Sequence, residues 1–506
     1  MNEHVSRRGF IKTAGVATGV MIATRFNPLS YAANEKVSVA SIGVGNQGTA
    51  HLQQGLAKAT NLQVVAVCDV YSRNRENAVK LVGEQCKAYA DYRELLDKEQ
   101  VDGVVIATPF YTHYPIVMDC LDKGIHVFCE KTMCQTIEQC RDVVKKCHDT
   151  GLFVQVGHQR RYNPKYNKAM WLAVDKNLLG RVTHMTAQWH RNSSWRRPVP
   201  DTLTDEDKKY IAEPDKHFNW RLYQALSGGL MTELATHQLD IMNWFMGSPP
   251  ARVAGLGCVN YWRDGRDVDD SVSLLYEWEI NPRKAGFRSI VARDSHQKES
   301  QLDRPYKVGM TYSSICANSK MDYSEHLYGD KGAIDLSEGD CKFFPDSVWM
   351  AEKKAREEAA KKAHESGGAP ASEKKPDEKT IISPPLPGSA ATEGLALEVY
   401  SNVATQDTTY NPFTPNHIQF QSFADDIIAK RTPKANQIVG LHAAISGLKG
   451  IEALAQRGTV EIDPALYAFD FETPDPFRYE FVDGPIPGAV SPEKKAQTTD
   501  AISGAT

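Results

Sequence analysis

The chain of 506 residues lacks a large net charge, a long apolar run and any closely paired cysteines. Its 59 Lys and Arg residues almost balance 63 Asp and Glu residues, which leaves a net charge of −4 at pH 7. Proteins that bind phosphate backbones carry a basic surface, so nucleic acid is not an expected partner. No stretch approaches the roughly 20 consecutive apolar residues that cross a bilayer, so no transmembrane segment is expected.

The ten cysteines contain no C-x-x-C pair, which argues against a zinc site. Their even number would allow a disulfide framework. Seven of them, however, crowd into the first α/β segment of the chain, several within expected strands or helices: Cys68, Cys86, Cys120, Cys129, Cys134, Cys140 and Cys147. Unpaired cysteine is commonly a small core residue, so the sequence favours buried free thiols.

The N-terminus carries the pattern S-R-R-G-F-I-K at Ser6–Lys12, followed by a modest apolar run over 14–24 and by Ala32 and Ala33. This resembles a bacterial twin-arginine signal, with isoleucine in place of the usual leucine. We therefore expect a signal peptide over residues 1–33, recognition by the twin-arginine export machinery, and a periplasmic or otherwise exported protein. Substrates of that machinery cross the membrane folded, which suits a core of reduced thiols.

Residues 36–158 alternate short apolar runs with helical patterns. Strands are expected at 37–44, 62–69, 103–107, 126–129 and 153–157, and helices at 48–58, 74–82, 92–98, 112–123 and 137–150. Helices between successive strands return the chain to the same edge of a sheet, so the pattern predicts a doubly wound parallel sheet of the Rossmann type.

Residues 159–480 have a different pattern, which predicts a second, α+β domain for substrate binding and oligomerisation. A helix is expected up to about 177, strands at 182–190, 253–261 and 271–279, and helices at 230–245, 417–430 and 437–456. The longer alternating runs predict a large, mostly antiparallel sheet. A charged and Pro-rich insertion at 351–395 is expected to be a solvated helix and loop, with a partner-binding arm as the alternative, and residues 485–506 a disordered tail.

The first candidate site is the sequence Gly43-Val44-Gly45-Asn46-Gln47-Gly48, a G-x-G-x-x-G between an expected strand and helix. Glycines allow the tight turn and the close approach to a pyrophosphate. Asp69 ends the next expected strand, 21 residues after Gly48, where a carboxylate would bind the adenosine ribose. The pattern predicts NAD, while the nearby Arg73 and Arg75 leave NADP open.

The second candidate site follows two further strands of the same sheet. Thr108-Pro109 and His113 come after one strand, and Glu130-Lys131 ends the next. Ligands of open α/β sheets bind at this carboxyl edge. A lysine beside a cationic nicotinamide would have a lowered pKa, which suits proton transfer. Taken alone, Glu130-Lys131 would equally well be a surface ion pair.

The third candidate site lies in the segment Gly228–Asp240. Glu233, His237 and Asp240 follow one another at i, i+4 and i+7, so a regular helix would place them on one face. A carboxylate one turn from a histidine can orient the imidazole. The same spacing would suit a metal, but no second cluster completes a site, so no metal is expected. A buried structural histidine is the other reading.

Together these three segments resemble the glucose–fructose oxidoreductase, inositol dehydrogenase and rhizopine-catabolism (Gfo/Idh/MocA) family, over about 36–339 and again over 417–462. The resemblance implies an N-terminal Rossmann domain, a C-terminal domain on a large, mostly antiparallel sheet, and activity on sugars, cyclitols and their derivatives.

The family motifs also imply roles for individual residues. Lys131 resembles the family's catalytic lysine, His237 the candidate acid/base, and Glu233 its carboxylate partner. Residues implied to border the substrate are Arg161, Tyr162, Trp220, Arg221 and Asp240. Three positions depart from the family pattern: Thr132 replaces a proline, Phe110 an asparagine, and Glu233 an aspartate.

The sequence thus predicts an NAD(P)-dependent oxidoreductase that moves a hydride at the CH–OH carbon of a sugar, polyol or cyclitol. Because free NAD is scarce outside the cytoplasm, tight retention of the cofactor is expected, and a homo-oligomer is expected as well. One alternative is a glycosidase that cleaves a glycoside by transient oxidation, elimination, hydration and reduction of the sugar, so that the cofactor is regenerated in every cycle. A binding protein that retains the fold is a third reading, against which the glycines, Lys131 and His237 argue.

Overall fold

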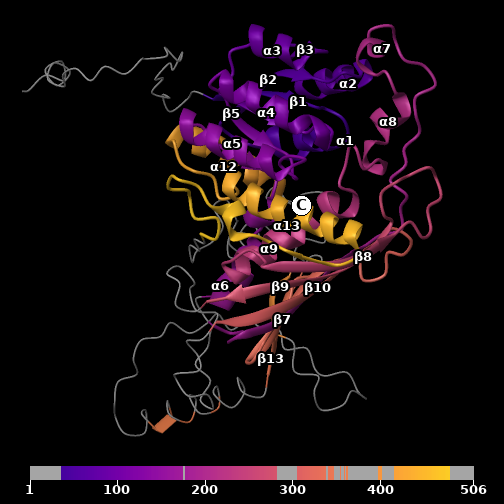
Figure 1. Ribbon diagram of the computed structural model, residues 1–506. Helices are drawn as coiled ribbons and strands as arrows, with labels where there is room; N and C mark the ends of the chain where they lie inside the picture. The colour runs from indigo at the N-terminus through magenta and orange to yellow at the C-terminus, as the bar shows by residue number, and fades with distance from the viewer. Residues whose placement is uncertain are drawn as a thin grey trace, which may run out of the picture.

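The computed structural model describes residues 36–174, 177–281, 305–337, 340–346, 397–401 and 415–478, with isolated positions at 354, 358, 361 and 362. The expected signal at 1–33, nearly all of the 351–395 insertion and the tail at 485–506 lie outside these residues. The described chain forms two sheets, one above the other in Figure 1, with helices between them.

The first sheet has six strands in the order β3-β2-β1-β4-β5-β6. These are β1 (Val37–Ile42), β2 (Leu62–Cys68), β3 (Lys87–Tyr89), β4 (Gly103–Ile106), β5 (His126–Cys129) and β6 (Val154–Val156), all paired in parallel. The order reverses between β1 and β4, which opens a crevice at their carboxyl ends. The expected Rossmann sheet is confirmed. Strand β3 was not expected, because it is three residues long and carries no buried side chain.

Helices complete the crossovers of this sheet: α1 (Asn46–His51), α2 (Ser72–Val82), α3 (Tyr92–Lys98), α4 (His113–Asp122) and α5 (Ile137–Thr150). A π-helical turn, Leu52–Leu56, continues α1. The strand β4 is buried along its whole length, as expected for a parallel sheet covered on both faces.

The ten cysteines are free thiols, and all but Cys258 are buried. The expectation of buried, unpaired cysteines in the first domain is confirmed. Burial raises the pKa of Cys86 to about 11, so this thiol stays protonated near neutral pH.

The second sheet has nine strands in the order β14-β13-β12-β11-β7-β10-β9-β8-β15. They are β7 (Val182–His190), β8 (Arg252–Cys258), β9 (Ser271–Ile280), β10 (Tyr306–Ile315), β11 (Tyr323–Gly329), β12 (Gly332–Asp335), β13 (Asp340–Pro345), β14 (Leu397–Ser401) and β15 (Thr459–Glu461). Neighbours are antiparallel except β7 and β10, which run parallel. The mostly antiparallel second sheet is therefore confirmed. The alternation of apolar and polar residues along the strands does not reveal that one pair, β7 and β10, runs parallel.

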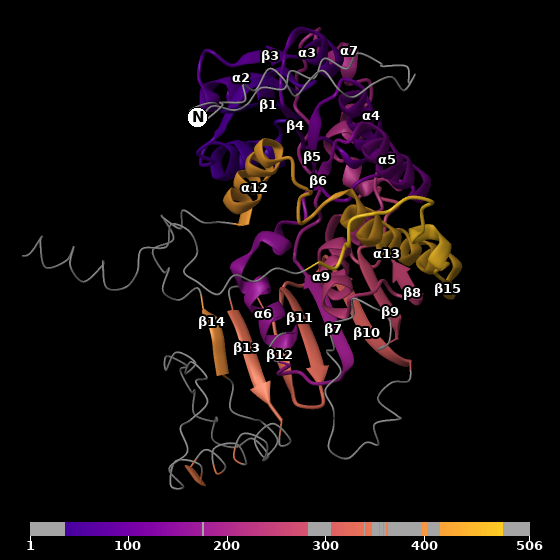
Figure 2. The same ribbon diagram turned by 90° about the vertical axis from the view of Figure 1, so that its left-hand side faces the viewer.

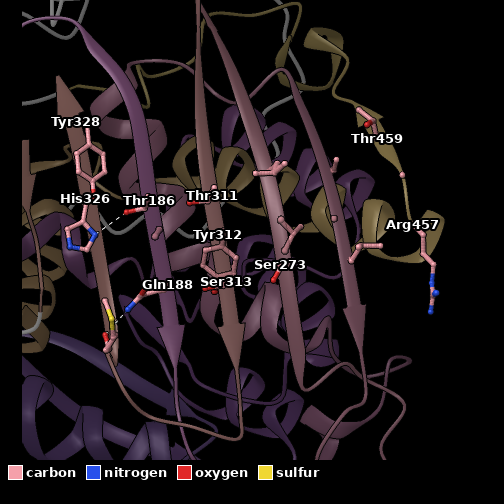
Figure 3. A pocket seen from close by; sticks show the side chains of 18 residues that line it. Thr186, Gln188, Ser273, Thr311, Tyr312, Ser313, His326, Tyr328, Arg457 and Thr459 are labelled. Atoms are coloured by element: carbon pink, nitrogen blue, oxygen red, sulfur yellow. Dashed lines mark hydrogen bonds between the residues drawn. The ribbon is translucent and has the colours of Figure 1, made fainter. Parts of the chain in front are cut away.

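Helices α6 (Pro164–Val174), α9 (Thr236–Met246) and α13 (Gln437–Gln456) cover one face of this sheet. The hydroxyl of Tyr276 on β9 donates to the carbonyl of Ser446 on α13, and that of Tyr166 on α6 to Glu325 on β11. Figure 3 looks onto the opposite face, with the helices behind the strands. The side chains that line this open face include Leu256 and Leu275, 63% and 60% exposed.

Helix α12 (Pro415–Ala429) packs on the Rossmann domain, although its sequence position assigned it to the second domain. Phe420 and Phe423 are fully buried against the first sheet, and the Phe420 ring lies 4.6 Å from that of Phe128. A Cβ on Gly103 would lie 2.9 Å from Phe423. This helix therefore packs with the first domain although it follows the second in sequence, because its apolar side chains complete the core of the first domain.

One described helix, α13, is long and apolar enough to cross a membrane by length and composition. His442, Lys449 and Glu452 interrupt its sequence, so it is not a run of consecutive apolar residues. Of its apolar window, 67% is buried within the protein, as in a core helix.

Candidate active site

The glycine loop between β1 and α1 has a geometry that only glycine allows at two positions. Gly43 has φ +84°, and a Cβ there would lie 2.7 Å from the backbone of Ala107. A Cβ on Gly48 would lie 1.9 Å from the Gly43 carbonyl oxygen. The loop therefore packs tightly against the strand, with Gly45 at the helix N-cap, the cradle that a pyrophosphate needs.

Asp69 holds the glycine loop at the end of β2. Its Oδ2 accepts from the Val44 backbone N–H at 2.9 Å and its Oδ1 from that of Tyr71 at 2.9 Å. Burial raises the pKa of this carboxyl, while the two backbone hydrogen bonds act in the opposite direction. Arg75 donates to the Asp69 carbonyl at 2.8 Å and pairs with Glu206, so its guanidinium is engaged within the protein.

A cavity of about 480 Å³ begins at this loop. Its first-domain lining includes seven of the expected cofactor residues, the last two of which follow β4: Gly43, Gly45, Asn46, Gln47, Asp69, Thr108 and Pro109. Its second-domain lining is Arg197, Tyr210, His217, Phe218, Trp220 and Arg221. Residues of both domains thus line one cavity, which begins at the loop where a dinucleotide would bind.

The second-domain wall of this cavity is the bridging segment, residues 196–223, which contains α7 (Asp207–Tyr210) and α8 (Pro214–Phe218). It lies beside α1 and α2 of the Rossmann domain (Figure 1). Asp207, 1% exposed, accepts from the backbone N–H of Ser72 at 2.7 Å and from its hydroxyl at 3.0 Å. Phe218 packs edge-on against Tyr71, with ring centroids 5.3 Å apart. No local sequence pattern predicts this contact between the two domains.

Glu130 faces the glycine loop. Its Oε1 lies 2.7 Å from His51 Nε2 and accepts from Gln47 Nε2 at 3.1 Å. Burial alone would raise its pKa, but His51 and Lys131 together bring the pKa of Glu130 down to about 2. Glu130 is therefore ionised. Because its carboxylate contacts the buried His51 and Gln47 of the glycine loop, Glu130 does not form the surface ion pair with Lys131 that was the alternative.

Lys131 points from the end of β5 into the second domain. Its Nζ donates to the carbonyl of Glu233 at 2.6 Å and lies 3.4 Å from that of Thr232. Burial lowers the pKa of this lysine, against the opposing charges of Glu233 and Glu130. The side chain thus carries an amine that loses its proton more readily than an exposed lysine.

The carbonyls that hold Lys131 belong to a π-helical turn, Met231–Ala235, that precedes α9. Such turns displace the normal hydrogen-bond ladder and are frequent at functional sites. The hydroxyls of Thr132 and Thr236 also donate to the Thr232 carbonyl, at 2.9 and 3.0 Å. Thr132, in place of the family's proline, therefore supplies a hydroxyl that ties β5 to this turn.

The expectation that Glu233 orients His237 was wrong. The Glu233 carboxylate accepts from Arg221 Nε at 2.8 Å, and no hydrogen bond joins it to His237 among the described residues. The wider π turn breaks the i, i+4 spacing of a regular helix, so the two side chains do not pair. The Glu233 carbonyl and carboxylate instead connect Lys131 with Arg221.

His237 is buried, 6% exposed, and its ring lies 5.4 Å from that of Trp189. Its Nδ1 has no hydrogen-bond partner within the described chain. Burial and the positive charge of Lys131 lower its pKa well below the ordinary value, so the imidazole is neutral. A neutral imidazole with an unpaired nitrogen beside a lysine is suited to exchange a proton with a bound group.

Three residues expected near the substrate instead support the scaffold. Arg161 forms a buried ion pair with Asp240, with Nη2–Oδ1 at 2.8 Å, and both side chains are almost inaccessible. The Tyr162 hydroxyl accepts from the Ala435 backbone at 3.2 Å. None of the three lines the cavity. Arg161 also donates to the Pro476 carbonyl, so these contacts join the start of the second domain to α9 and to the C-terminal segment.

His113 and Phe110 hold the loop after β4. The His113 ring nitrogens lie 3.0 Å from the Thr132 carbonyl and 3.1 Å from that of Thr108, and burial lowers the pKa of this imidazole. Phe110, in place of asparagine, is buried with its ring centroid 6.0 Å from that of His113. His113 thus positions the two loops that carry Thr108 and Lys131.

The described residues contain no group of three or more His, Cys, Asp and Glu side chains that would hold a metal ion.

Residues 37–158 match the model of an oxidoreductase family with an NAD-binding Rossmann fold, and residues 168–283 match the Gfo/Idh/MocA C-terminal domain. An inositol 2-dehydrogenase/D-chiro-inositol 3-dehydrogenase of Lactiplantibacillus plantarum is 27% identical over 216 residues, 42% of this chain and 54% of that protein. A glycosyl hydrolase family 109 protein of Shewanella baltica is 25% identical over 237 residues, 41% of this chain and 50% of that protein.

The chain spans about half the length of these curated relatives. Among solved structures, a levoglucosan dehydrogenase in complex with NADH and L-sorbose superimposes with a TM-score of 0.59 at 16% identity, over 85% of this chain and 99% of that chain. This likeness shows the shared fold. Both domains thus match models of the Gfo/Idh/MocA oxidoreductase family, one after the other along the chain.

Proposed function

We propose that the chain is an NAD-dependent oxidoreductase that transfers a hydride at a CH–OH carbon of a sugar, polyol or cyclitol. The observation that carries this proposal is that Lys131, which follows β5 of the sheet with the glycine loop, lies close enough to the buried His237 for its charge to act on the imidazole. A lysine and a neutral histidine at the same place supply a proton acceptor for a hydroxyl that becomes a carbonyl.

A bound nicotinamide would supply the hydride acceptor or donor. The glycine loop and Asp69 would hold its dinucleotide, and Thr108 and Pro109 line the cavity further along. Lys131, in its neutral form, would take the hydroxyl proton, with the carbonyls of the π turn fixing the direction of its Nζ. His237 would exchange a proton at the same oxygen or orient it, and burial of both groups excludes bulk water.

The test is a single-turnover experiment on purified protein loaded with NAD, mixed in turn with sugars, cyclitols and glycosides. Net reduced cofactor, measured by absorbance, supports a dehydrogenase. An intact, NAD-loaded protein that neither reduces the cofactor nor alters any sugar would refute the enzymatic proposal.

A glycosidase that recycles its cofactor is the second candidate. It is favoured by the similarity to the glycosyl hydrolase family 109 protein and by the expected export signal, since an exported enzyme has little free NAD. Product chromatography in the same experiment distinguishes the two. Cleavage of a glycoside without net reduction of the cofactor would establish the recycling reaction.

We also propose that the cofactor is retained between turnovers, because the bridging segment closes the cavity over the α2 end. Asp207→Ala removes the carboxylate that holds Ser72 to this segment. A hydrogen bond to a charged group contributes about 1.5–3 kcal/mol, so the dissociation rate of NADH is expected to rise about ten-fold or more. Stopped-flow displacement of NADH measures that rate.

The matched control is Asp205→Ala in the same segment. The side chain of Asp205 is 98% exposed and pairs with Lys208, three residues away in the same segment. Equal NADH dissociation rates for the two variants would mean that the bridging segment does not retain the cofactor.

We propose that two copies of the chain associate through the open face of the second sheet (Figure 3). Isolated exposed leucines are ordinary, but Leu256 and Leu275 lie on one sheet face without a covering helix among the described elements. Replacing both with arginine is expected to reduce the mass in light scattering to that of one chain. Leu81→Arg, at an exposed leucine on α2, should leave the mass unchanged. A wild-type monomer at micromolar concentration would contradict this proposal.

Finally, we propose export by the twin-arginine route, on the pattern Ser6–Lys12. Replacing Arg7 and Arg8 together with lysine should keep the protein in the cytoplasm, as judged by cell fractionation. Unchanged export of that variant would refute the route.

A further inference from the structure

The Thr232 carbonyl is the point where Lys131 meets two threonine hydroxyls. This oxygen of the π turn accepts from the hydroxyl of Thr132 at 2.9 Å and from that of Thr236 at 3.0 Å. The Nζ of Lys131 lies 3.4 Å from the same oxygen. Three donors therefore compete for one carbonyl.

A carbonyl oxygen has two lone pairs, so the two hydroxyls already match its capacity. Lys131 makes its short hydrogen bond to the next carbonyl, that of Glu233, at 2.6 Å. Its distance to the Thr232 oxygen is beyond the usual N–H···O range. Because an ammonium group has three N–H donors, the charged form of Lys131 is poorly supplied with acceptors at the π turn.

Both threonines are buried and closely packed. Thr132 is 2% exposed and Thr236 is fully buried, and their hydroxyl oxygens lie 3.1 Å apart. The Thr132 carbonyl is 3.0 Å from Nδ1 of His113, and a Cβ on Gly447 of α13 would lie 2.9 Å from the Thr236 methyl group. Neither threonine lines the cavity, so any effect on the reaction would act through the π turn and Lys131.

We propose that Thr132 and Thr236 are positioning residues that occupy the Thr232 carbonyl, deny Lys131 a second acceptor and so favour its neutral amine. Hydrogen bonds to a charged group stabilise the charged form, and withholding one has the opposite effect. The inference rests on the proposed function, in which the neutral amine takes the proton of a substrate hydroxyl.

Other groups also act on Lys131, and the threonines do not alter them. Burial lowers the pKa of this lysine. Its titratable and charged neighbours come from both domains: Glu130, His158, Arg221, Glu233 and His237. Valine in place of threonine leaves all of these groups in the chain, so a changed titration of Lys131 would come from the freed carbonyl.

Thr132→Val and Thr236→Val each remove one hydroxyl and keep the size of the side chain. The freed lone pair of the Thr232 carbonyl then becomes available to the Lys131 ammonium, so sugar oxidation should require a higher pH. On the rising part of the pH profile kcat is expected to fall about 2–10-fold, the effect of one neutral hydrogen bond, while KM and the plateau at high pH stay within about two-fold. Thr132→Ser keeps the hydroxyl and should restore the wild-type profile.

The kinetics use the sugar that reduces NAD fastest in the single-turnover experiment. Thr150→Val, at the end of α5, is the matched control, because this hydroxyl also donates to a backbone carbonyl, that of Lys146 at 2.7 Å. The control should leave the pH profile unchanged even if its melting temperature falls.

A second readout requires no substrate. In NADH-loaded protein with isotope-labelled lysine Cε, the NMR signal of Lys131 is the one that Lys131→Met removes. The midpoint of its titration should lie at higher pH in Thr132→Val and Thr236→Val than in the wild-type protein.

A pH profile that is unchanged in both variants, or a rate that falls equally at every pH, would overturn the inference and leave the threonines a purely structural role. A titration of Lys131 that moves as expected in a protein without any redox or cleavage activity would support the role of the hydroxyls and refute the enzymatic proposal.

Discussion

Lys131→Met is expected to lower kcat about 10²–10⁴-fold, the contribution typical of a general acid or base. Methionine keeps most of the side-chain volume but removes the Nζ that donates to the Glu233 carbonyl. The glycine loop and Asp69 are untouched, so the dissociation constant of NADH should change much less than kcat. Single-turnover rates and NADH titrations on the same preparations measure both quantities.

The pH dependence of this variant provides a second readout. Burial lowers the pKa of Lys131, so its neutral, proton-accepting form appears at a lower pH than for an exposed lysine. Sugar oxidation by the wild-type protein should therefore rise with pH through this lowered pKa and level off above it. Because the variant has no amine to titrate, that rise should be lost.

Lys123→Met is the matched control. Lys123 is half exposed and pairs with Asp97 at the surface of the same domain, so kcat and the pH profile should be unchanged. If Lys131→Met kept near-normal turnover and the same pH profile, Lys131 would have no role in proton transfer.

His237→Ala is expected to reduce kcat by a similar factor, about 10²–10⁴-fold, if the imidazole exchanges a proton with the substrate. Its Nδ1 makes no hydrogen bond that the variant would break within the described chain. The melting temperature should therefore fall only by the effect of a small cavity. Calorimetry and single-turnover kinetics on one preparation separate the two effects.

His442→Ala provides the structural comparison. This histidine is also buried, burial lowers its pKa to about 3, and its ring contacts Tyr467 and Phe477 away from Lys131. Its loss should lower the melting temperature while the folded protein keeps its turnover. If His237→Ala behaved in this same way, His237 would be a structural residue.

Glu233 shows the limit of reading side-chain pairs from spacing. The i, i+4 relation with His237 assumed a regular helix, and a single π turn over Met231–Ala235 changes which side chains meet. The sequence of this turn has no glycine or proline that would mark it. Carbonyls of this turn accept hydrogen bonds from Lys131 and Thr132, which lie about 100 residues earlier in the chain.

Asp240, Arg161 and Tyr162 show a second limit. Their residue types and their positions beside the family's active-site motifs suggested that they bind substrate. Whether such side chains are accessible, however, depends on which other segments pack over them. Here the C-terminal segment contributes the Pro476 carbonyl to Arg161 and the Ala435 N–H to Tyr162, more than 270 residues away in sequence. Those contacts bury polar groups that a local pattern would leave free for a ligand.

The sequence by itself determined the features that depend on local rules. Alternating strands and helices require a parallel sheet, the glycines at 43 and 48 are needed by the backbone itself, and residues that end parallel strands meet at one edge. The tertiary structure alone decided the π turn, the return of α12 to the first domain and the closure by residues 196–223. Each of these arises from contacts between residues far apart in the chain, whose energies no local pattern contains.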